Sequence, residues 1–178
     1  ILLHTNMMNK LALAIASMAS VASAVSLPGT WGYEQANATY DVNYFYWFFE
    51  PASGATDAPV VLWLTGGPGC SSELALFFEN GPYHVNAAGN AVTPNKFGWN
   101  QENYLLYVDQ PGGTGFSTVG NPGGYVTNEA QVAGDMYTFL TNFFNKYPNL
   151  AANDFYIFGE SFAGHYVPAI GAYLVQNA

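Results

Sequence analysis

"DFYIFGESFAGHYVP", residues 154–168, is the stretch that decides the fold. Phe155–Gly159 is apolar and predicts a buried strand, and a helix-like pattern begins directly after the serine that follows it. A strand that turns sharply into a helix, with a serine at the corner, is typical of a nucleophile elbow, which exposes the hydroxyl above a sheet. We predict that Ser161 is a nucleophile; a serine in such a turn can otherwise serve only as a helix cap.

The sequence at this corner departs from the usual elbow at one position. An elbow normally reads G-x-S-x-G, because small residues let the strained turn close. Residues 159–163 read GESFA, so alanine occupies the place of the second glycine. Ala163 is still small enough for the helix and the strand to pack closely. We therefore expect the elbow to form.

Other apolar segments predict the rest of an α/β layer. Val60–Thr65 and Tyr104–Asp109 predict strands covered on both faces, and Tyr44–Glu50 predicts an aromatic strand. A helix is predicted to start at Asn128, because Gln131 follows three residues later as in a capping box. Strands that alternate with a helix predict an α/β fold with a mostly parallel central sheet and flanking helices. The residues at helical spacing are Val132, Met136, Leu140, Phe143 and Tyr147.

Three glycine-rich stretches follow the predicted strands, and the carboxyl ends of parallel strands gather at one edge of a sheet. Attack on a carbonyl carbon creates an oxyanion that needs two main-chain donors, one of them from the residue after the nucleophile. We assign these donors to Phe162 and to Gly67 in "GGPGCSS", residues 66–72, where Pro68 has no N–H. The alternative is that this stretch is only a tight turn.

A base for the serine is not evident in the chain. In hydrolases with a nucleophile elbow, the acid and the histidine follow the serine in the sequence. His84 precedes Ser161, and His165 belongs to the helix that descends behind the hydroxyl. We therefore expect His165 to be a hydrogen-bonded packing residue rather than the base, and Asp109 to be a structural acid at a strand end.

The composition argues against nucleic acid as a partner. Only 8% of the 178 residues are charged, the formal net charge is −9, and the chain has three scattered lysines and no arginine. Binding to phosphate needs clustered cations, which are missing here.

Asn37 begins an Asn-Ala-Thr sequon, which predicts glycosylation. Cys70 is the only cysteine, so it is either a buried free thiol or has its partner outside this chain.

The N-terminus has the pattern of a secretory signal. Lys10 precedes an uncharged apolar run, and small residues lead to a predicted cleavage site after Ala24. The run is too short to span a membrane. We interpret residues 7–24 as a signal peptide and residues 1–6 as an upstream extension, so that residues 25–178 form the domain. A buried N-terminal helix is the alternative.

Three long blocks of the chain resemble the serine carboxypeptidases, including the lysosomal cathepsin A and vacuolar carboxypeptidase types. They read "WLTGGPGCSSELALFFENGPY", "FGWNQENYLLYVDQPGGTGFS" and "NDFYIFGESFAGHYVPA". The resemblance implies an α/β-hydrolase fold and an enzyme that releases C-terminal residues from peptides through an acyl-enzyme, with no cofactor and no metal. In this family, residues matching Ser161, Gly67 and Phe162 are the nucleophile and the two oxyanion donors.

The resemblance also implies a subsite for the terminal carboxylate of the peptide. Glu79 and Glu160 match glutamates that bind this group together with the residue at Thr65 and the backbone of Gly66. Carboxylates cannot cluster while all are ionised, so at least one holds a proton and its pKa is raised. Peptidase activity is therefore expected to favour acid. Alternatively, the two glutamates are only solvated acids of a helix and a helix start.

Two departures from the family leave alternatives open. Many members have asparagine in place of Thr65. The threonine resembles both a carboxypeptidase branch that reads TGGPGCSSELAL and plant acyltransferases of the same family. Those transferases typically have aspartate in place of Glu160, so the glutamate favours a peptidase. Family members continue well beyond the helix after the serine, where their triad Asp and His and the partner of Cys70 lie. We therefore expect this chain to be a fragment that is inactive alone.

The expected partners are peptide or protein C-termini, and the expected location is the secretory route, ending in a lysosome, a vacuole or the extracellular space. The alternatives are an acyltransferase and a noncatalytic binding or protective subunit. The oligomeric state is not predicted by any feature of the sequence.

Overall fold

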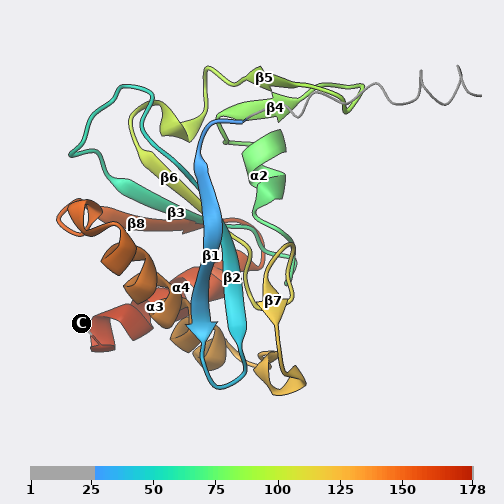
Figure 1. The fold of residues 1–178 in the computed structure, drawn as a ribbon, viewed down its shortest axis with the longest axis vertical. Coiled ribbons are helices and arrows are strands. Elements are labelled where there is room, and N and C mark those ends of the chain that lie inside the picture. Colours follow the sequence, from blue (N-terminus) through green and yellow to red (C-terminus); the bar gives the residue numbers. More distant parts are fainter. Residues whose placement is uncertain (1–26, 178) are drawn as a thin grey trace, which may run out of the picture.

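The computed structural model of the chain describes residues 27–177. The predicted signal peptide and upstream extension, residues 1–24, lie outside the described residues. Figure 1 shows a twisted sheet flanked by helices, with a small antiparallel hairpin of β4 (Tyr83–Val85) and β5 (Val92–Pro94) at one end of the molecule.

Three strands of the main sheet are parallel to one another. β3 (Val60–Leu64) lies between β6 (Tyr104–Val108) and β8 (Phe155–Gly159). They confirm the three apolar runs as strands and, with the helices, the predicted α/β class. The sheet order is β1-β2-β6-β3-β8, and β2 runs antiparallel to β1, β6 and β7. The remaining strands are β1 (Thr30–Asn37), β2 (Val42–Phe49) and β7 (Thr118–Val119).

Helices cover both faces of this sheet. α3 (Glu129–Lys146) and α4 (Ala163–Asn177) contact each other and cover one face, whereas α2 (Glu73–Phe78) packs on the other (Figure 1). Short 3-10 helices connect the main elements: η1 (Trp99–Gln101), η2 (Pro122–Gly124) and η3 (Pro148–Leu150). Among the described helices, none is both long enough and apolar enough for a membrane crossing.

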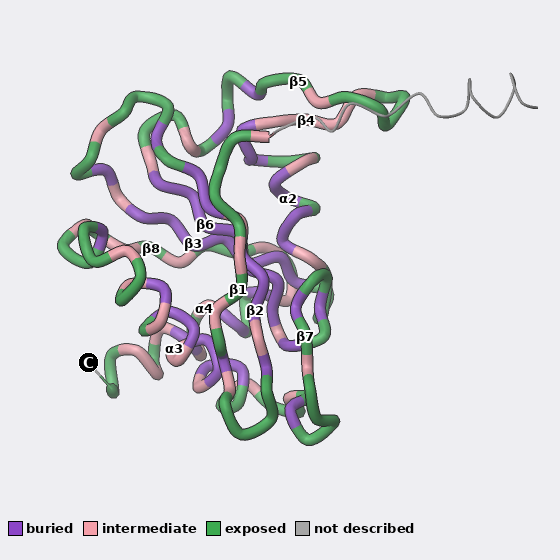
Figure 2. The backbone as a smooth tube through the Cα atoms, viewed as in Figure 1, coloured by how far each residue is buried: buried purple, intermediate pink, exposed green. Residues whose placement is uncertain are grey.

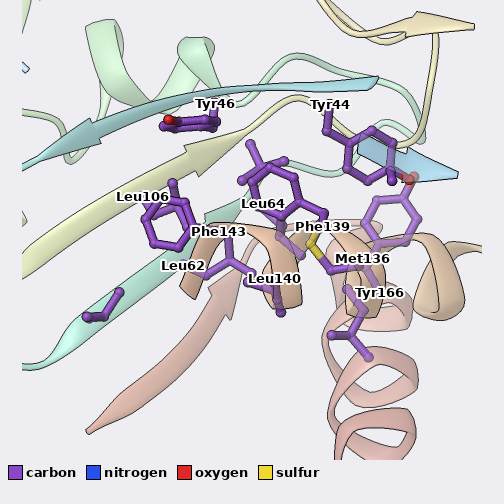
Figure 3. Close-up of a cluster of buried hydrophobic side chains, with 14 of the residues drawn as sticks. Tyr44, Tyr46, Leu62, Leu64, Leu106, Met136, Phe139, Leu140, Phe143 and Tyr166 are labelled. Atoms are coloured by element: carbon purple, nitrogen blue, oxygen red, sulfur yellow. The ribbon is translucent and has the colours of Figure 1, made fainter. Parts of the chain in front are cut away.

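The alternation of side chains along β3 explains its unbroken apolar sequence. All five of its residues are buried, because successive side chains point to opposite faces and each face is covered. Leu62 and Leu64 pack in the cluster with α3 and α4, whereas Val61 and Trp63 pack with α2. β3 and β6 are purple, the colour of buried residues, in Figure 2. Figure 3 shows how tyrosine, leucine and phenylalanine side chains fill the space between the sheet and α3 and α4.

The start of α3 is fixed by side-chain caps. Asn128 Oδ1 accepts a hydrogen bond from the Gln131 N–H (3.1 Å), and Gln131 Oε1 accepts one from the Thr127 N–H (2.7 Å). The predicted helix start is confirmed, although the Gln131 side chain reaches one residue further back than in a standard capping box. The apolar residues predicted at helical spacing are buried, except for Tyr147, which is the partly exposed C-cap.

β8 is an edge strand within residues 27–177, and two of its aromatic side chains are exposed. The prediction that Phe155–Gly159 is a strand is confirmed, but the prediction that it is buried is wrong, because no strand pairs with its outer edge in this part of the chain. Tyr156 is 49% and Phe158 43% exposed. An exposed apolar edge promotes self-association. We expect Tyr156→Lys in the isolated 178-residue chain to weaken self-association about ten-fold, or ~1.4 kcal/mol, measured by sedimentation velocity. Phe97→Lys, at an exposed aromatic residue on a loop, is the control and should have a smaller effect.

Candidate active site

The chain turns at Ser161 in a conformation that residues with side chains rarely adopt. Ser161 has a φ of +54°, in the left-handed region. A serine held there costs about 1–3 kcal/mol, and such strain is found at functional sites. Ser161 is exposed and lies between the end of β8 and the start of α4. The predicted strand–serine–helix corner is therefore present, with its hydroxyl open to solvent.

Small residues on either side of the serine let the corner close. A Cβ atom on Gly159 would lie 2.6 Å from Ala163 Cβ and 2.8 Å from Leu64 O, so only glycine fits this position. Ala163 is fully buried, which confirms that alanine is small enough at its position. Around Gly164, by contrast, a Cβ atom would meet nothing within 4 Å. The close approach of helix and strand thus depends on Gly159 and Ala163.

The loop after β3 packs directly against this corner. A Cβ atom on Gly66 would lie 2.5 Å from the Phe162 nitrogen and 2.8 Å from the Glu160 carbonyl oxygen. Gly67 follows with a φ of +108°, a conformation that favours glycine. Within residues 27–177, the N–H groups of Gly67 and Phe162 have no hydrogen-bond acceptor. Two loops that are far apart in the sequence therefore meet beside the serine and carry unpaired main-chain donors.

The two glutamates singled out from the sequence also lie together. Glu79 is the C-cap of α2, and Glu160 immediately precedes the serine. The side chains of Glu79 and Glu160 are in hydrogen-bonding contact. Partial burial, followed by the charge of Glu160, raises the pKa of Glu79. Glu79 thus retains its proton more readily than a lone glutamate.

Thr65 is held at the end of β3 by a neighbour that the sequence did not reveal. Its hydroxyl accepts a hydrogen bond from Trp63 Nε1 (3.2 Å), and its N–H donates to Ser72 Oγ (3.3 Å). Both Thr65 and Trp63 are buried. Residues two apart on a strand share one face, so the pairing of an indole donor with this hydroxyl could have been found from their spacing.

A sequence model of the family "Serine carboxypeptidase" matches residues 20–178 of this chain. The chain belongs to the serine carboxypeptidase family. It is 56% identical over 142 residues to a serine carboxypeptidase-like protein of Oryza sativa subsp. japonica, a match that covers 79% of this chain and 33% of the relative. It is 48% identical over 146 residues to serine carboxypeptidase 3 of Hordeum vulgare, covering 82% of this chain and 28% of that protein. This chain thus spans about a third of the length of such curated relatives.

The fold agrees with that of a solved carboxypeptidase. The crystal structure of Kex1(delta)p, a prohormone-processing carboxypeptidase from Saccharomyces cerevisiae, superposes with a TM-score of 0.77 at 30% identity. The match covers 84% of this chain and 34% of that chain. The central sheet and its flanking helices therefore have the α/β-hydrolase fold, as the resemblance implied.

Two histidines lie in the described part of this family member, and neither is hydrogen-bonded to the serine hydroxyl. His165 is exposed, and its ring packs on Phe162 with centroids 4.7 Å apart. The expectation that His165 is a hydrogen-bonded packing residue is wrong in part, because within residues 27–177 its ring packs but has no hydrogen-bond partner. His84 Nδ1 lies 3.4 Å from the Phe77 carbonyl oxygen. Asp109 is fully buried at the end of β6, which confirms it as a structural acid.

Cys70 and Asn37 lie in very different surroundings. Cys70 is a free and exposed thiol on the loop after β3, so the interpretation as a buried free thiol is wrong. Asn37 ends β1, and its Nδ2 donates a hydrogen bond to Asp135 Oδ1 (2.9 Å). Its Oδ1 accepts one from the Thr39 N–H (3.1 Å). Glycosylation of Asn37 stays a prediction.

The described residues contain no group of three or more His, Cys, Asp or Glu side chains arranged to hold a metal ion.

Proposed function

We propose that the full-length protein containing this chain is a serine carboxypeptidase that releases C-terminal residues from peptides through an acyl-enzyme at Ser161. The observation that carries the proposal is the strained, exposed serine beside two main-chain N–H groups without acceptors, those of Gly67 and Phe162. An oxyanion that forms at this corner would find both donors already in place, and preorganised donors of this kind supply a large part of the catalysis of acyl transfer. Family membership supports the same chemistry.

The reaction follows from this arrangement. Ser161 Oγ forms a bond to the carbonyl carbon of the last peptide bond as its proton passes to a base, and the carbonyl oxygen becomes an oxyanion that Gly67 and Phe162 bind. The C–N bond then breaks, and the C-terminal residue takes a proton and leaves as a free amino acid. Water hydrolyses the ester in the second half of the reaction. We assign the base and the acid that orients it to parts of the full-length protein outside this chain.

The carboxyl pair accounts for preference for a free C-terminus. In the proposed complex, Glu79 and Glu160 share a proton and bind the terminal carboxylate of the substrate, with Thr65 and the Gly66 backbone beside them. Gly66 contacts the Phe162 amide at the elbow, so that the carboxylate subsite adjoins the oxyanion donors. A carboxylate substrate bound there would place its last peptide bond next to Ser161.

This pair makes substrate binding depend on pH. The pKa of Glu79 is raised, so the pair is protonated in acid and loses its proton as the pH rises. We expect KM for a peptide with a free C-terminus to rise about ten-fold per pH unit above that pKa, because each unit lowers the protonated fraction ten-fold. In Glu79→Gln the amide donates at every pH, so the slope should flatten. Steady-state kinetics across the pH range measure this dependence of KM on pH for wild type and for Glu79→Gln.

An amidated peptide is the matched control, since it lacks the terminal carboxylate. A KM for the acid peptide that stays constant with pH, or that changes equally for the amidated peptide, would contradict the assignment of Glu79.

The proposed function itself is tested by supplying peptide and acyl-ester substrates side by side to the full-length protein. Release of free C-terminal residues supports a peptidase, whereas transfer of the acyl group to an acceptor in preference to hydrolysis would favour an acyltransferase. A noncatalytic role would be indicated if Ser161→Ala left the biological activity intact. The proposed location is the secretory route, ending in a lysosome, a vacuole or outside the cell.

A further inference from the structure

A second pair of carboxyl groups, separate from Glu79 and Glu160, is buried beside residues 66–72. We call these residues the oxyanion loop, because they include Gly67. Glu73, the first residue of α2, is 8% exposed, and Asp109 at the end of β6 is fully buried. Their side chains are in hydrogen-bonding contact. Two carboxylates that are both ionised cannot hydrogen-bond to each other, because each has only acceptor oxygens. One of the two must therefore carry a proton.

The hydrogen bonds of the pair favour Glu73 as the protonated group. Both oxygens of Asp109 accept main-chain hydrogen bonds, from the Ser72 N–H (3.0 Å) and the Phe116 N–H (2.8 Å), as an ionised group does. Glu73 Oε2 accepts a hydrogen bond from the Ser71 hydroxyl, whereas Glu73 Oε1 is buried and has no donor within residues 27–177. An oxygen without a donor in a buried site is explained if it bears the proton that it donates to Asp109.

Within residues 27–177, no cation forms an ion pair with either carboxyl group. Of the described lysines, Lys146 is bonded to Glu34, and neither it nor Lys96 forms an ion pair with Glu73 or Asp109. Burial, and then the neighbouring Asp109, raises the pKa of Glu73 to about 8. Among the charged groups nearby, only Asp109 contributes to this rise. The other titratable groups on the elements around α2 are Cys70 on the preceding loop, Tyr83 and His84 on β4, Tyr107 on β6 and Glu79 at the end of α2.

The Glu73–Asp109 pair lies between two loops, residues 66–72 and residues 110–117. Ser72, next to Glu73, donates its hydroxyl hydrogen to the Val108 carbonyl oxygen (2.7 Å) and accepts the Thr65 N–H. On the other side, a Cβ atom on Gly115 would overlap the Asp109 carboxyl group, so the loop after β6 wraps closely around it. The proton between Glu73 and Asp109 thus joins the loop of residues 66–72 to the loop of residues 110–117.

We propose that Glu73 is a positioning residue for the oxyanion loop, because the proton that it shares with Asp109 holds residues 66–72 in the position where the Gly67 N–H can serve Ser161. The effect of Glu73 on catalysis rests on the proposed function, whereas the proton shared by Glu73 and Asp109 does not. When the proton is lost, two carboxylates are left side by side in a buried site, and their repulsion displaces the loop.

The sign of the pH effect follows from the raised pKa. In the unfolded chain Glu73 ionises at its ordinary value of 4.5, whereas in the folded protein it does so at about 8. The stability that this group contributes is fully present below the lower value and is lost as the pH rises through the higher one. Glu73→Gln cannot ionise and can still donate to Asp109, so the variant should not lose stability across this range.

The test compares wild type, Glu73→Gln and Glu73→Ala in the full-length protein, by the rate at which a fluorophosphonate labels Ser161 and by Tm. The ratio of the labelling rate of Glu73→Gln to that of wild type is expected to be about 1 near pH 6 and about 10 near pH 9, since wild type loses ten-fold in protonated pairs per unit above its pKa. Glu73→Ala should be slower than wild type already in acid. Glu102→Gln, at an exposed acid, is the matched control and should keep a ratio of about 1 throughout.

A direct titration keeps the inference separate from the proposed function and from any folding defect of a variant. In wild type labelled with ¹³C at glutamate carboxyl carbons, the signal absent from Glu73→Gln is expected to titrate near pH 8. If no labelling of Ser161 occurs at any pH, the peptidase proposal fails, while this titration still decides the inference. Titration of Glu73 near 4.5, or labelling ratios that stay constant with pH, would overturn it.

Discussion

Ser161→Ala in the full-length protein is expected to lower kcat for peptide hydrolysis by about 10⁴-fold or more, with KM within about three-fold of wild type. The substitution removes the atom that forms the acyl-enzyme but leaves the backbone corner and the carboxylate subsite in place. Because substrate binding then persists without chemistry, the loss should appear in kcat. Initial rates with a peptide of free C-terminus, together with single-turnover kinetics, measure it.

A matched variant at the same position separates chemistry from folding. Ser161→Gly also lacks the hydroxyl, but glycine adopts a φ of +54° without strain. We expect it to be as inactive as Ser161→Ala and to have a free energy of unfolding higher by roughly 1 kcal/mol. If either variant retained more than about a hundredth of wild-type kcat, Ser161 would not be the nucleophile.

Gly66→Ala is expected to lower kcat by about 10²-fold to 10³-fold. The added Cβ atom would lie 2.5 Å from the Phe162 nitrogen and 2.8 Å from the Glu160 carbonyl oxygen. Both contacts are with main-chain atoms, which cannot rotate away, so the loop must move and carry the Gly67 donor out of position. We also expect a loss of about 1–3 kcal/mol in stability from the overpacking. Kinetics well below the Tm of the variant separate the two effects.

Gly164→Ala is the control for this prediction. Gly164 lies in the first turn of α4, where a Cβ atom meets nothing within 4 Å, and alanine favours helix over glycine. We expect wild-type kcat and a stability equal to or up to about 1 kcal/mol above wild type. Equal kcat losses at Gly66 and Gly164 would show that the activity is sensitive to any change near the elbow, and not to the oxyanion donors.

β3 and β6 could be predicted because both of their faces are covered, whereas β8 could be predicted from its apolar residues although it is an edge strand with exposed side chains. β3, β6 and β8 each appear in the sequence as a short apolar run with glycine or proline nearby, and α3 appears through its cap and its helical spacing. β1 was not predicted, because it is the first strand of an antiparallel edge hairpin and carries polar residues such as Glu34 and Gln35. The β4–β5 hairpin has three residues in each strand, too few for a clear pattern.

The site was predictable to a different degree at each residue. The sharp turn at Ser161, which has a positive φ, could be expected because small residues flank the serine. The contact between Gly66 and Phe162 could be expected because both residues follow parallel strands, whose carboxyl ends lie at the same edge of the sheet. The contact between Glu79 and Glu160 could be expected only from the resemblance, since no local pattern joins them. The Glu73–Asp109 pair gave no signal, because an acid at the first position of a helix is ordinarily a solvated residue.

A crystal structure of the full-length protein after reaction with a fluorophosphonate would show whether Ser161 faces the amides of Gly67 and Phe162. We predict phosphorus bonded to Ser161 Oγ and a phosphoryl oxygen about 2.7–3.1 Å from both nitrogens, as in an occupied oxyanion hole. An adduct on another residue, or a phosphoryl oxygen directed away from these two N–H groups, would contradict the account.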